Sequence, residues 1–267
     1  MNRCANGNPA PTGRPGPRWS VQAWSLVGLG YLAAFGAATV AALYTLAGRA
    51  DRLPGWFVDV YDGLVYSGVL VAAVAFLVGR RRLGLSRTEL GLPPRREAFS
   101  ARSLVAVAAA YLVMRIAFAV LALLPQPESA KASEVLNTGM GTGRILLWSA
   151  TAGVVEEALL LALPVAVMTR MRWPWPAQLA VLVALRLPFH LYYGVQFLAQ
   201  AVIWAGGLLF VYRRYRVLWP FALAHFLYDT ISQSLYGRAN PLLGAALLVL
   251  GGFSMVCVAR GRFGRTT

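Results

Sequence analysis

Long apolar runs separated by short polar segments repeat along the whole chain. A helix needs about 20 residues to cross a hydrocarbon core of about 30 Å. Eight runs meet or approach this length, although the fifth and sixth are short. They are Ala23–Ala47, Val58–Val78, Ser103–Leu124, Ile145–Met168, Ala177–Tyr193, Phe197–Tyr212, Leu218–Leu235 and Pro241–Val258. The pattern predicts an all-α, polytopic membrane protein with about eight transmembrane helices.

Basic residues fall unevenly between these runs. With both termini placed in the cytoplasm, the cytoplasmic segments hold 18 of the 25 Lys and Arg residues, the opposite side holds five, and two lie within runs. Cytoplasmic loops of membrane proteins carry an excess of Lys and Arg, so both termini are expected to be cytoplasmic. The predicted organisation is a disordered cytoplasmic tail (1–20), helices one to three (21–125), core helices four to seven (144–236), and a last helix with a basic tail (240–267).

Composition supports a membrane protein and narrows the partners. The chain is 58% apolar with a mean hydropathy of +0.58, which is too high for a soluble domain of 267 residues. A net charge of +15 could indicate nucleic-acid binding, but the Arg residues form short clusters between apolar runs. The lipid bilayer is therefore the expected partner, and nucleic acid is not. Only one of the 25 basic residues is Lys, a bias that suggests a GC-rich genome and a multi-pass protein of the bacterial inner (plasma) membrane.

Several ionisable residues interrupt the predicted spans. Each costs about 2.5–3.5 kcal/mol at the centre of a helix, so their presence inside the membrane requires a reason. They are Arg115, Glu156, Glu157, Arg186, His190, His225 and Asp229. His190 and His225 are the only histidines in the protein, and both lie in predicted spans. This concentration predicts a functional site within the bilayer.

The expected depths of these residues bring most of them together. Glu156 and His225 come out roughly 12 Å and 11 Å above the inner face of the core. Asp229 follows His225 by four residues and shares its helix face. His190 comes out roughly 8 Å nearer the outside and fits least well, although Pro188 makes the register of this span unreliable.

This set of side chains suits attack of an activated water on an amide. Two adjacent carboxylates in a low dielectric cannot both ionise cheaply, which favours one of them as a general base. An imidazole can share in activating the water, and a second imidazole beside a carboxylate can polarise a carbonyl. Glu156, His190, His225 and Asp229 are also compatible with zinc ligation.

Three short motifs resemble those of the CAAX-protease and bacteriocin-processing (CPBP) family of intramembrane endopeptidases. That family carries EExxxR, FxxxH and HxxxN or HxxxD on separate helices. The corresponding segments here are EEALLL at 156–161, RLPFH at 186–190 and HFLYD at 225–229. The resemblance covers about Ile145–Leu235 and implies an intramembrane endopeptidase acting on a peptide or protein substrate.

By this resemblance, Glu156 and His190 would activate the water. His225 and Asp229 would stabilise the oxyanion or help bind a metal, and Glu157 would support the site. The metal with which these ligands are compatible is zinc.

Two positions depart from the family pattern. Leu161 stands where the first motif usually has Arg, and Arg186 stands where the second usually has Phe. A buried carboxylate needs a compensating cation. We therefore infer that Arg186, on span five, supplies the guanidinium that span four lacks. Asp229 favours metal ligation or orientation of His225, because an ionised carboxylate cannot donate to an oxyanion.

Other functions fit the same residues less closely. A catalytically silent relative could act as a membrane scaffold or immunity protein, and Leu161 favours that interpretation. A proton-coupled transporter could use the residues as a relay, but no inverted repeat is evident. Arg115 has no assigned role, so packing or snorkelling is expected. The sequence leaves the substrate and the oligomeric state open.

Overall fold

The computed structural model describes residues 15–49, 52–93, 101–121, 141–193 and 196–235. These residues form helices and connecting turns and contain no β-strand. The helices are α1 (Pro17–Leu46), α2 (Gly55–Arg82), α4 (Ala101–Leu121), α6 (Thr142–Glu157), η2 (Ala158–Ala162), α7 (Leu163–Arg170), α8 (Trp175–Arg186), η3 (Pro188–Tyr193), α9 (Gln196–Tyr215) and α10 (Trp219–Leu235). The all-α prediction is confirmed.

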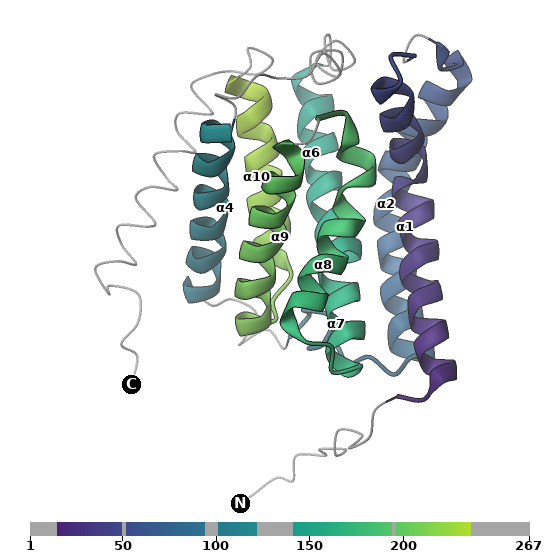
Figure 1. Ribbon diagram of the computed structural model, residues 1–267, viewed down its shortest axis with the longest axis vertical. Coiled ribbons are helices and arrows are strands. Elements are labelled where there is room, and N and C mark those ends of the chain that lie inside the picture. Colours follow the sequence, from purple (N-terminus) through teal and green to yellow (C-terminus); the bar gives the residue numbers. More distant parts are fainter. Residues whose placement is uncertain (1–14, 50–51, 94–100, 122–140, 194–195, 236–267) are drawn as a thin grey trace, which may run out of the picture.

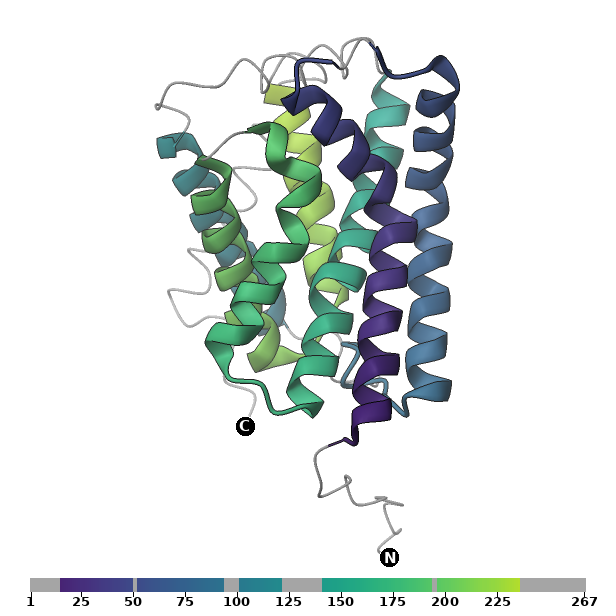
Figure 2. The ribbon, with the colours of Figure 1, turned by 45° about the vertical axis from the view of Figure 1, so that its right-hand side comes forward.

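The helices run side by side as a bundle (Figures 1 and 2). α1 and α2 pack together at one edge, α4 lies at the opposite edge against α9 and α10, and α6 packs on α10. Three helical segments are long and apolar enough to cross a membrane: Pro17–Leu46, Gly63–Arg82 and Thr142–Arg170. α4 and α8 contain shorter apolar stretches. The protein is therefore a multi-pass membrane protein.

The first seven predicted runs coincide with these helices. The eighth run, Pro241–Val258, and most of the N-terminal tail lie outside the described residues. The total of eight spans and the cytoplasmic orientation of the termini accordingly stay predictions.

The rod formed by α6, η2 and α7 is the centre of the bundle. In the most apolar 18-residue window of this rod, 94% of the residues are buried. The corresponding windows of α1 and α2 are each 22% buried. α1 and α2 instead expose large apolar side chains such as Leu29, Leu32 and Leu70. A wide exposed apolar surface is unstable in water but suits contact with lipid tails. The central rod is thus shielded from lipid by the other helices.

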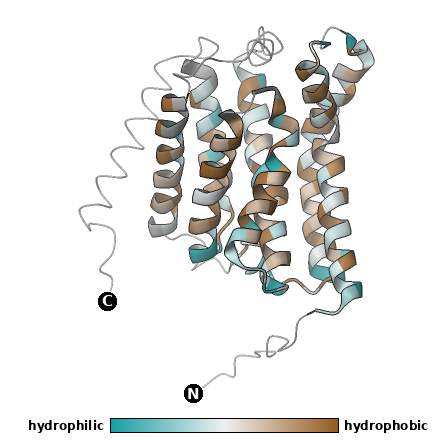
Figure 3. Ribbon diagram, in the orientation of Figure 1, coloured by the Kyte–Doolittle hydropathy of each residue, from teal (hydrophilic) through white to brown (hydrophobic). Residues whose placement is uncertain are grey.

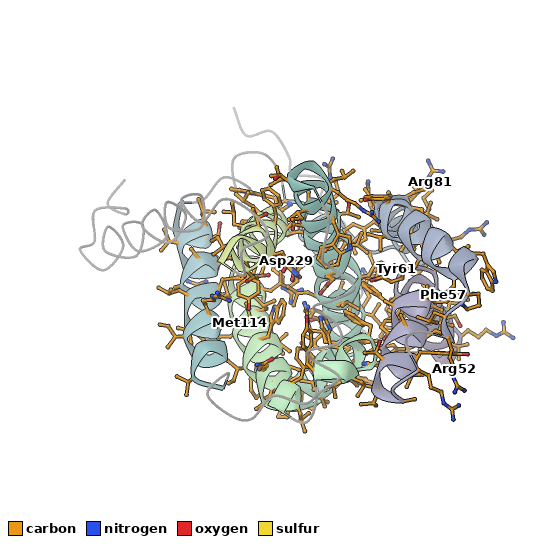
Figure 4. All side chains as sticks on the ribbon, turned by 90° about the horizontal axis from the view of Figure 1, so that it is seen from above. Arg52, Phe57, Tyr61, Arg81, Met114 and Asp229 are labelled. Atoms are coloured by element: carbon orange, nitrogen blue, oxygen red, sulfur yellow. The ribbon has the colours of Figure 1, made fainter. Side chains whose placement is uncertain are left out.

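Basic side chains gather at one end of the bundle. The last turns of α2, α7 and α9 carry Arg80–Arg82, Arg170 and Arg213–Arg214. All three ends lie at the end where α1 begins (Figure 1), and hydrophilic residues colour that end in Figure 3. Arg81 points away from the bundle when the molecule is viewed along the helices (Figure 4). Several segments thus place their charge on one side, as the positive-inside pattern requires.

A π-helix interrupts the central rod directly after the paired glutamates. η2 covers Ala158–Ala162, and α-helix resumes at Leu163 with Pro164 in its first turn. Pro164 has no N–H, and its ring would clash with the carbonyl four residues earlier in a regular α-helix. Widening the preceding turn to i→i+5 relieves that clash. The same segment therefore tolerates a proline in its interior without breaking.

Candidate active site

Glu156 and Glu157 end α6 in the middle of the bundle. Glu157 is fully buried and Glu156 is 8% exposed. Glycine permits this placement, because a Cβ on Gly153 would lie 2.6 Å from the backbone oxygen of Ala222 and 3.0 Å from the amide nitrogen of Phe226. α6 and α10 therefore cross closely one turn before the glutamates. This crossing brings Glu157 beside His225.

Arg186 compensates the charge of both glutamates. It is the last residue of α8, and its side chain is almost completely buried. Nη1 lies 3.2 Å from Oε2 of Glu156, and Nη2 lies 3.3 Å from Oε1 of Glu157. The proximity inferred from the sequence is observed, since the guanidinium comes from span five. Leu161 is buried in the apolar core instead.

His225 lies between three carboxylates. Its Nδ1 is 2.8 Å from Oε1 of Glu157, while its Nε2 is 3.9 Å from Oε2 of Glu156 and 3.6 Å from Oδ2 of Asp229. Asp229 follows one turn later on α10 and faces the interior of the bundle (Figure 4). The two ends of the imidazole thus face different carboxylates, which fixes the orientation of the ring.

Five of the six candidate residues therefore form one connected cluster: Glu156, Glu157, Arg186, His225 and Asp229. All five lie within residues 138–231, the segment that matches the family model described as type II CAAX prenyl endopeptidase Rce1-like. In this segment the chain is similar to the Rce1-like family. The resemblance predicted from the three motifs is confirmed at the level of the family.

The Rce1-like match covers just over a third of the 267 residues. It spans the glutamates of α6, the Arg186–His190 segment and residues 219–231 of α10, so every candidate residue lies inside it. No curated protein and no solved structure matches the chain.

His190, in the same Rce1-like segment, occupies a different environment. The chain leaves the α-helix after Arg186 and continues as the 3₁₀-helix η3, beginning at Pro188. Nδ1 of His190 lies 3.1 Å from the carbonyl oxygen of Arg186. Its ring stacks on Phe197 of α9, with centroids 4.6 Å apart. The backbone contact thus ties His190 to Arg186, the residue that partners the glutamates, while the aromatic stack holds its ring against α9.

Two further residues contact the cluster, and the sequence analysis missed both. Tyr111 of α4 donates a hydrogen bond of 3.1 Å to Oε1 of Glu157. Cζ of Arg186 lies 5.1 Å from the ring centroid of Trp204 on α9, and the Trp204 ring meets the His225 ring edge-on. A tryptophan in the middle of a span was the available signal, because membrane tryptophans usually lie at the interfaces.

The donor set does not fit the zinc site considered from the sequence. Among the described residues, no group of three or more His, Cys, Asp or Glu side chains is arranged to hold a metal ion. The cation beside both glutamates is the guanidinium of Arg186, which would repel a metal ion placed there. The metalloprotease interpretation is therefore unsupported by the arrangement of these side chains.

Proposed function

We propose that the protein is an intramembrane endopeptidase that hydrolyses a peptide bond with a water activated by Glu156 and His190. The observation that carries the proposal is the position of the Glu156 carboxylate. It lies inside the bundle beside a guanidinium and an imidazole, within the segment similar to type II CAAX prenyl endopeptidases. We further propose the bacterial plasma membrane as its location.

The two glutamates differ in the number of hydrogen bonds they accept. Glu157 accepts from Tyr111, Arg186 and His225. Such a carboxylate is stabilised as a fixed anion and is poorly suited to accept a proton. Glu156 is bound by Arg186 at a single oxygen. This difference supports Glu156 as the general base and Glu157 as a positioning residue.

The carbonyl contact of His190 fixes its tautomer. A carbonyl oxygen can only accept, so Nδ1 of His190 carries the proton that it donates to Arg186. In the neutral imidazole, Nε2 then carries the lone pair and can accept a proton or a hydrogen bond from water. This tautomer supports a share for His190 in activating the water.

His225 suits the opposite task. Because Nδ1 is engaged by Glu157, Nε2 is the nitrogen that can face the substrate. When both nitrogens carry protons, Nε2 can donate to the oxygen that becomes negative as the carbonyl is attacked. Asp229, 3.6 Å from Nε2, would orient the ring.

The reaction would proceed in two steps. Water transfers one proton to Glu156 as its oxygen bonds to the carbonyl carbon, which gives a tetrahedral intermediate with a negative oxygen near His225. The C–N bond then breaks, and the proton held by Glu156 passes to the departing amine. The products are a carboxylic acid and an amine. The acid then gives its proton to the amine or to solvent water, and Glu156 is again a carboxylate.

Cleavage by the purified protein tests this proposal. The full-length chain, in detergent or lipid nanodiscs, would be incubated with a pooled library of hydrophobic peptides, and the products identified by mass spectrometry. Glu156→Gln keeps the shape of the side chain but removes the base, so the rate should fall by about 100-fold or more. Glu89→Gln is the matched control, because Glu89 pairs with Arg170 at the end of the bundle.

The silent-scaffold alternative predicts a different result. In that case the wild type and Glu156→Gln would be equally inactive toward every peptide of the library while both remain folded. Equal cleavage by the two proteins would contradict the proposed base.

A further inference from the structure

Arg115 is the one ionisable residue from the sequence analysis that the proposed chemistry does not use. It lies on α4, partly buried, four residues after Tyr111. Nη1 donates a hydrogen bond of 3.2 Å to the hydroxyl of Ser232 on α10. The guanidinium lies 5.7 Å from the ring centroid of Tyr228. Within the described residues these contacts are with neutral groups.

A guanidinium in a membrane span normally has an anionic partner or a functional role. Its charge is costly to bury, and neutral hydroxyl and aromatic groups compensate it only in part. The hydroxyl of Ser232 accepts a hydrogen bond from one of the five N–H groups of the Arg115 guanidinium. The planar fork of an arginine suits two-point binding of a carboxylate. The contacts of Arg115 therefore fit an anion supplied by a bound molecule.

Arg115 lies within reach of the candidate active site. Tyr111, one turn earlier on α4, touches Glu157, so Arg115 lies about 6 Å further along the bundle. On α10, Ser232 follows His225 by seven residues, which corresponds to about 10 Å. An extended peptide advances about 3.3 Å per residue. The guanidinium is therefore two or three residues of extended peptide away from the cluster.

We propose that Arg115, held in place by Ser232 and the ring of Tyr228, binds a carboxylate of the substrate two or three residues from the scissile bond. This assignment rests on the proposed endopeptidase function. The carboxylate is either the α-carboxylate at the end of a peptide or the side chain of an Asp or Glu. In both cases the ion pair holds the peptide in register with Glu156.

Matched peptide pools distinguish the two sources. One pool carries free α-carboxylates, a second has the same sequences with C-terminal amides, and a third consists of amides with an Asp or Glu placed two or three residues beyond candidate bonds. A charge-assisted hydrogen bond contributes about 1.5–3 kcal/mol, so the wild type should favour the preferred anionic pool by about tenfold or more. A terminal source favours the first pool alone, whereas a side-chain source favours the third.

Variants at Arg115 assign the preference to this residue. In Arg115→Gln the preference should disappear through a higher KM for the anionic pool, and Arg115→Lys should recover part of it. Arg49→Gln, which removes an exposed arginine beyond α1, is the control and should keep the full preference. Size-exclusion profiles and thermal unfolding of each variant establish that it is folded.

A binding measurement separates this assignment from the proposed function. Fluorescent peptides from each pool would be titrated against Glu156→Gln and against Glu156→Gln/Arg115→Gln, with anisotropy as the readout. Tighter binding of the anionic peptides that depends on Arg115 supports the site even if no peptide is cleaved. Equal binding of anionic and amidated peptides, or a preference that survives in the Arg115→Gln protein, overturns it.

Discussion

Nδ1 of His225 lies 2.8 Å from Oε1 of Glu157, and this contact connects α10 to α6 at the centre of the bundle. The same oxygen accepts from Tyr111 on α4 and from Arg186 on α8. One carboxylate oxygen thus joins four helices that are far apart in the sequence. The position of His225 is consequently as sensitive to helix packing as to the side chains beside it.

Gly153→Ala should separate α6 from α10. The added methyl would lie 2.6 Å from the backbone oxygen of Ala222, and a backbone atom cannot move aside as a flexible side chain can. We expect overpacking to lower the free energy of unfolding by about 1–3 kcal/mol. We also expect the variant to lose most of the cleavage activity. Thermal unfolding and peptide cleavage of the same preparations measure both effects.

Gly28→Ala is the matched control for this substitution. A Cβ on Gly28, in α1, would meet no atom within 4 Å. Since alanine is the better helix former, this variant should be as stable as the wild type or more so. If Gly153→Ala behaves like Gly28→Ala, the close crossing does not determine the geometry of the site.

Arg186→Leu should destabilise the protein strongly. The substitution leaves two buried carboxylates without their guanidinium, and removing one partner of a buried ion pair costs about 3–5 kcal/mol. Unfolding by SDS titration in mixed micelles would measure the loss. Arg81→Leu, at the exposed end of α2, should change stability little.

Neutralising a carboxylate should offset part of that loss. Adding Glu157→Gln to Arg186→Leu removes one uncompensated charge. The double variant should therefore lose less unfolding free energy than the sum of the losses in the two single variants. Simple additivity would show that Arg186 and Glu157 do not interact as the 3.3 Å contact indicates.

Tyr111→Phe removes one of the three donors to Glu157 while keeping the aromatic ring. We expect a loss of about 1.5–3 kcal/mol, as for other hydrogen bonds to charged groups. Because Tyr111 acts through Glu157 and His225, kcat should fall several-fold and KM should stay the same. Tyr66→Phe, on the exposed surface of α2, provides the comparison. A change confined to KM would place Tyr111 in substrate binding instead.

Chelators should leave the activity unchanged. Arg186 supplies the positive charge beside both glutamates, and Nδ1 of His225 is engaged by Glu157. Cleavage would be followed before and after treatment with EDTA or phenanthroline and dialysis. Inactivation that is reversed by added zinc, but not by magnesium, would show that the side chains rearrange around a metal.

The fold was largely predictable, because the hydrophobic runs are long and a membrane helix must satisfy its own backbone. The fifth run was harder to interpret. Its α-helix ends at Arg186 and continues as 3₁₀-helix from Pro188, so the depth predicted for His190 from a uniform rise per residue does not apply. Proline signalled the break, but the local geometry after it depends on tertiary packing.

The clustering of the candidate residues was predictable where charge stood out against an apolar background. The glutamates, Arg186, His225 and Asp229 were identified because ionisable groups are rare in spans. Tyr111 and Trp204 were missed because an aromatic residue in an apolar run cannot be distinguished from the other hydrophobic residues of that run. Their contacts with Glu157 and Arg186 follow from the pairing of helices, which spacing along one helix does not reveal.

The wide turn at Ala158–Ala162 bears on how the first motif is compared between proteins. In a regular α-helix, residue 161 would stand directly over Glu157, since positions four apart share a face. With i→i+5 hydrogen bonds that alignment is lost. A basic side chain introduced at Leu161 would then enter the apolar core and not reach the glutamates. Alignment by letter spacing alone would consequently misjudge this chain as lacking a guanidinium that its three-dimensional arrangement supplies.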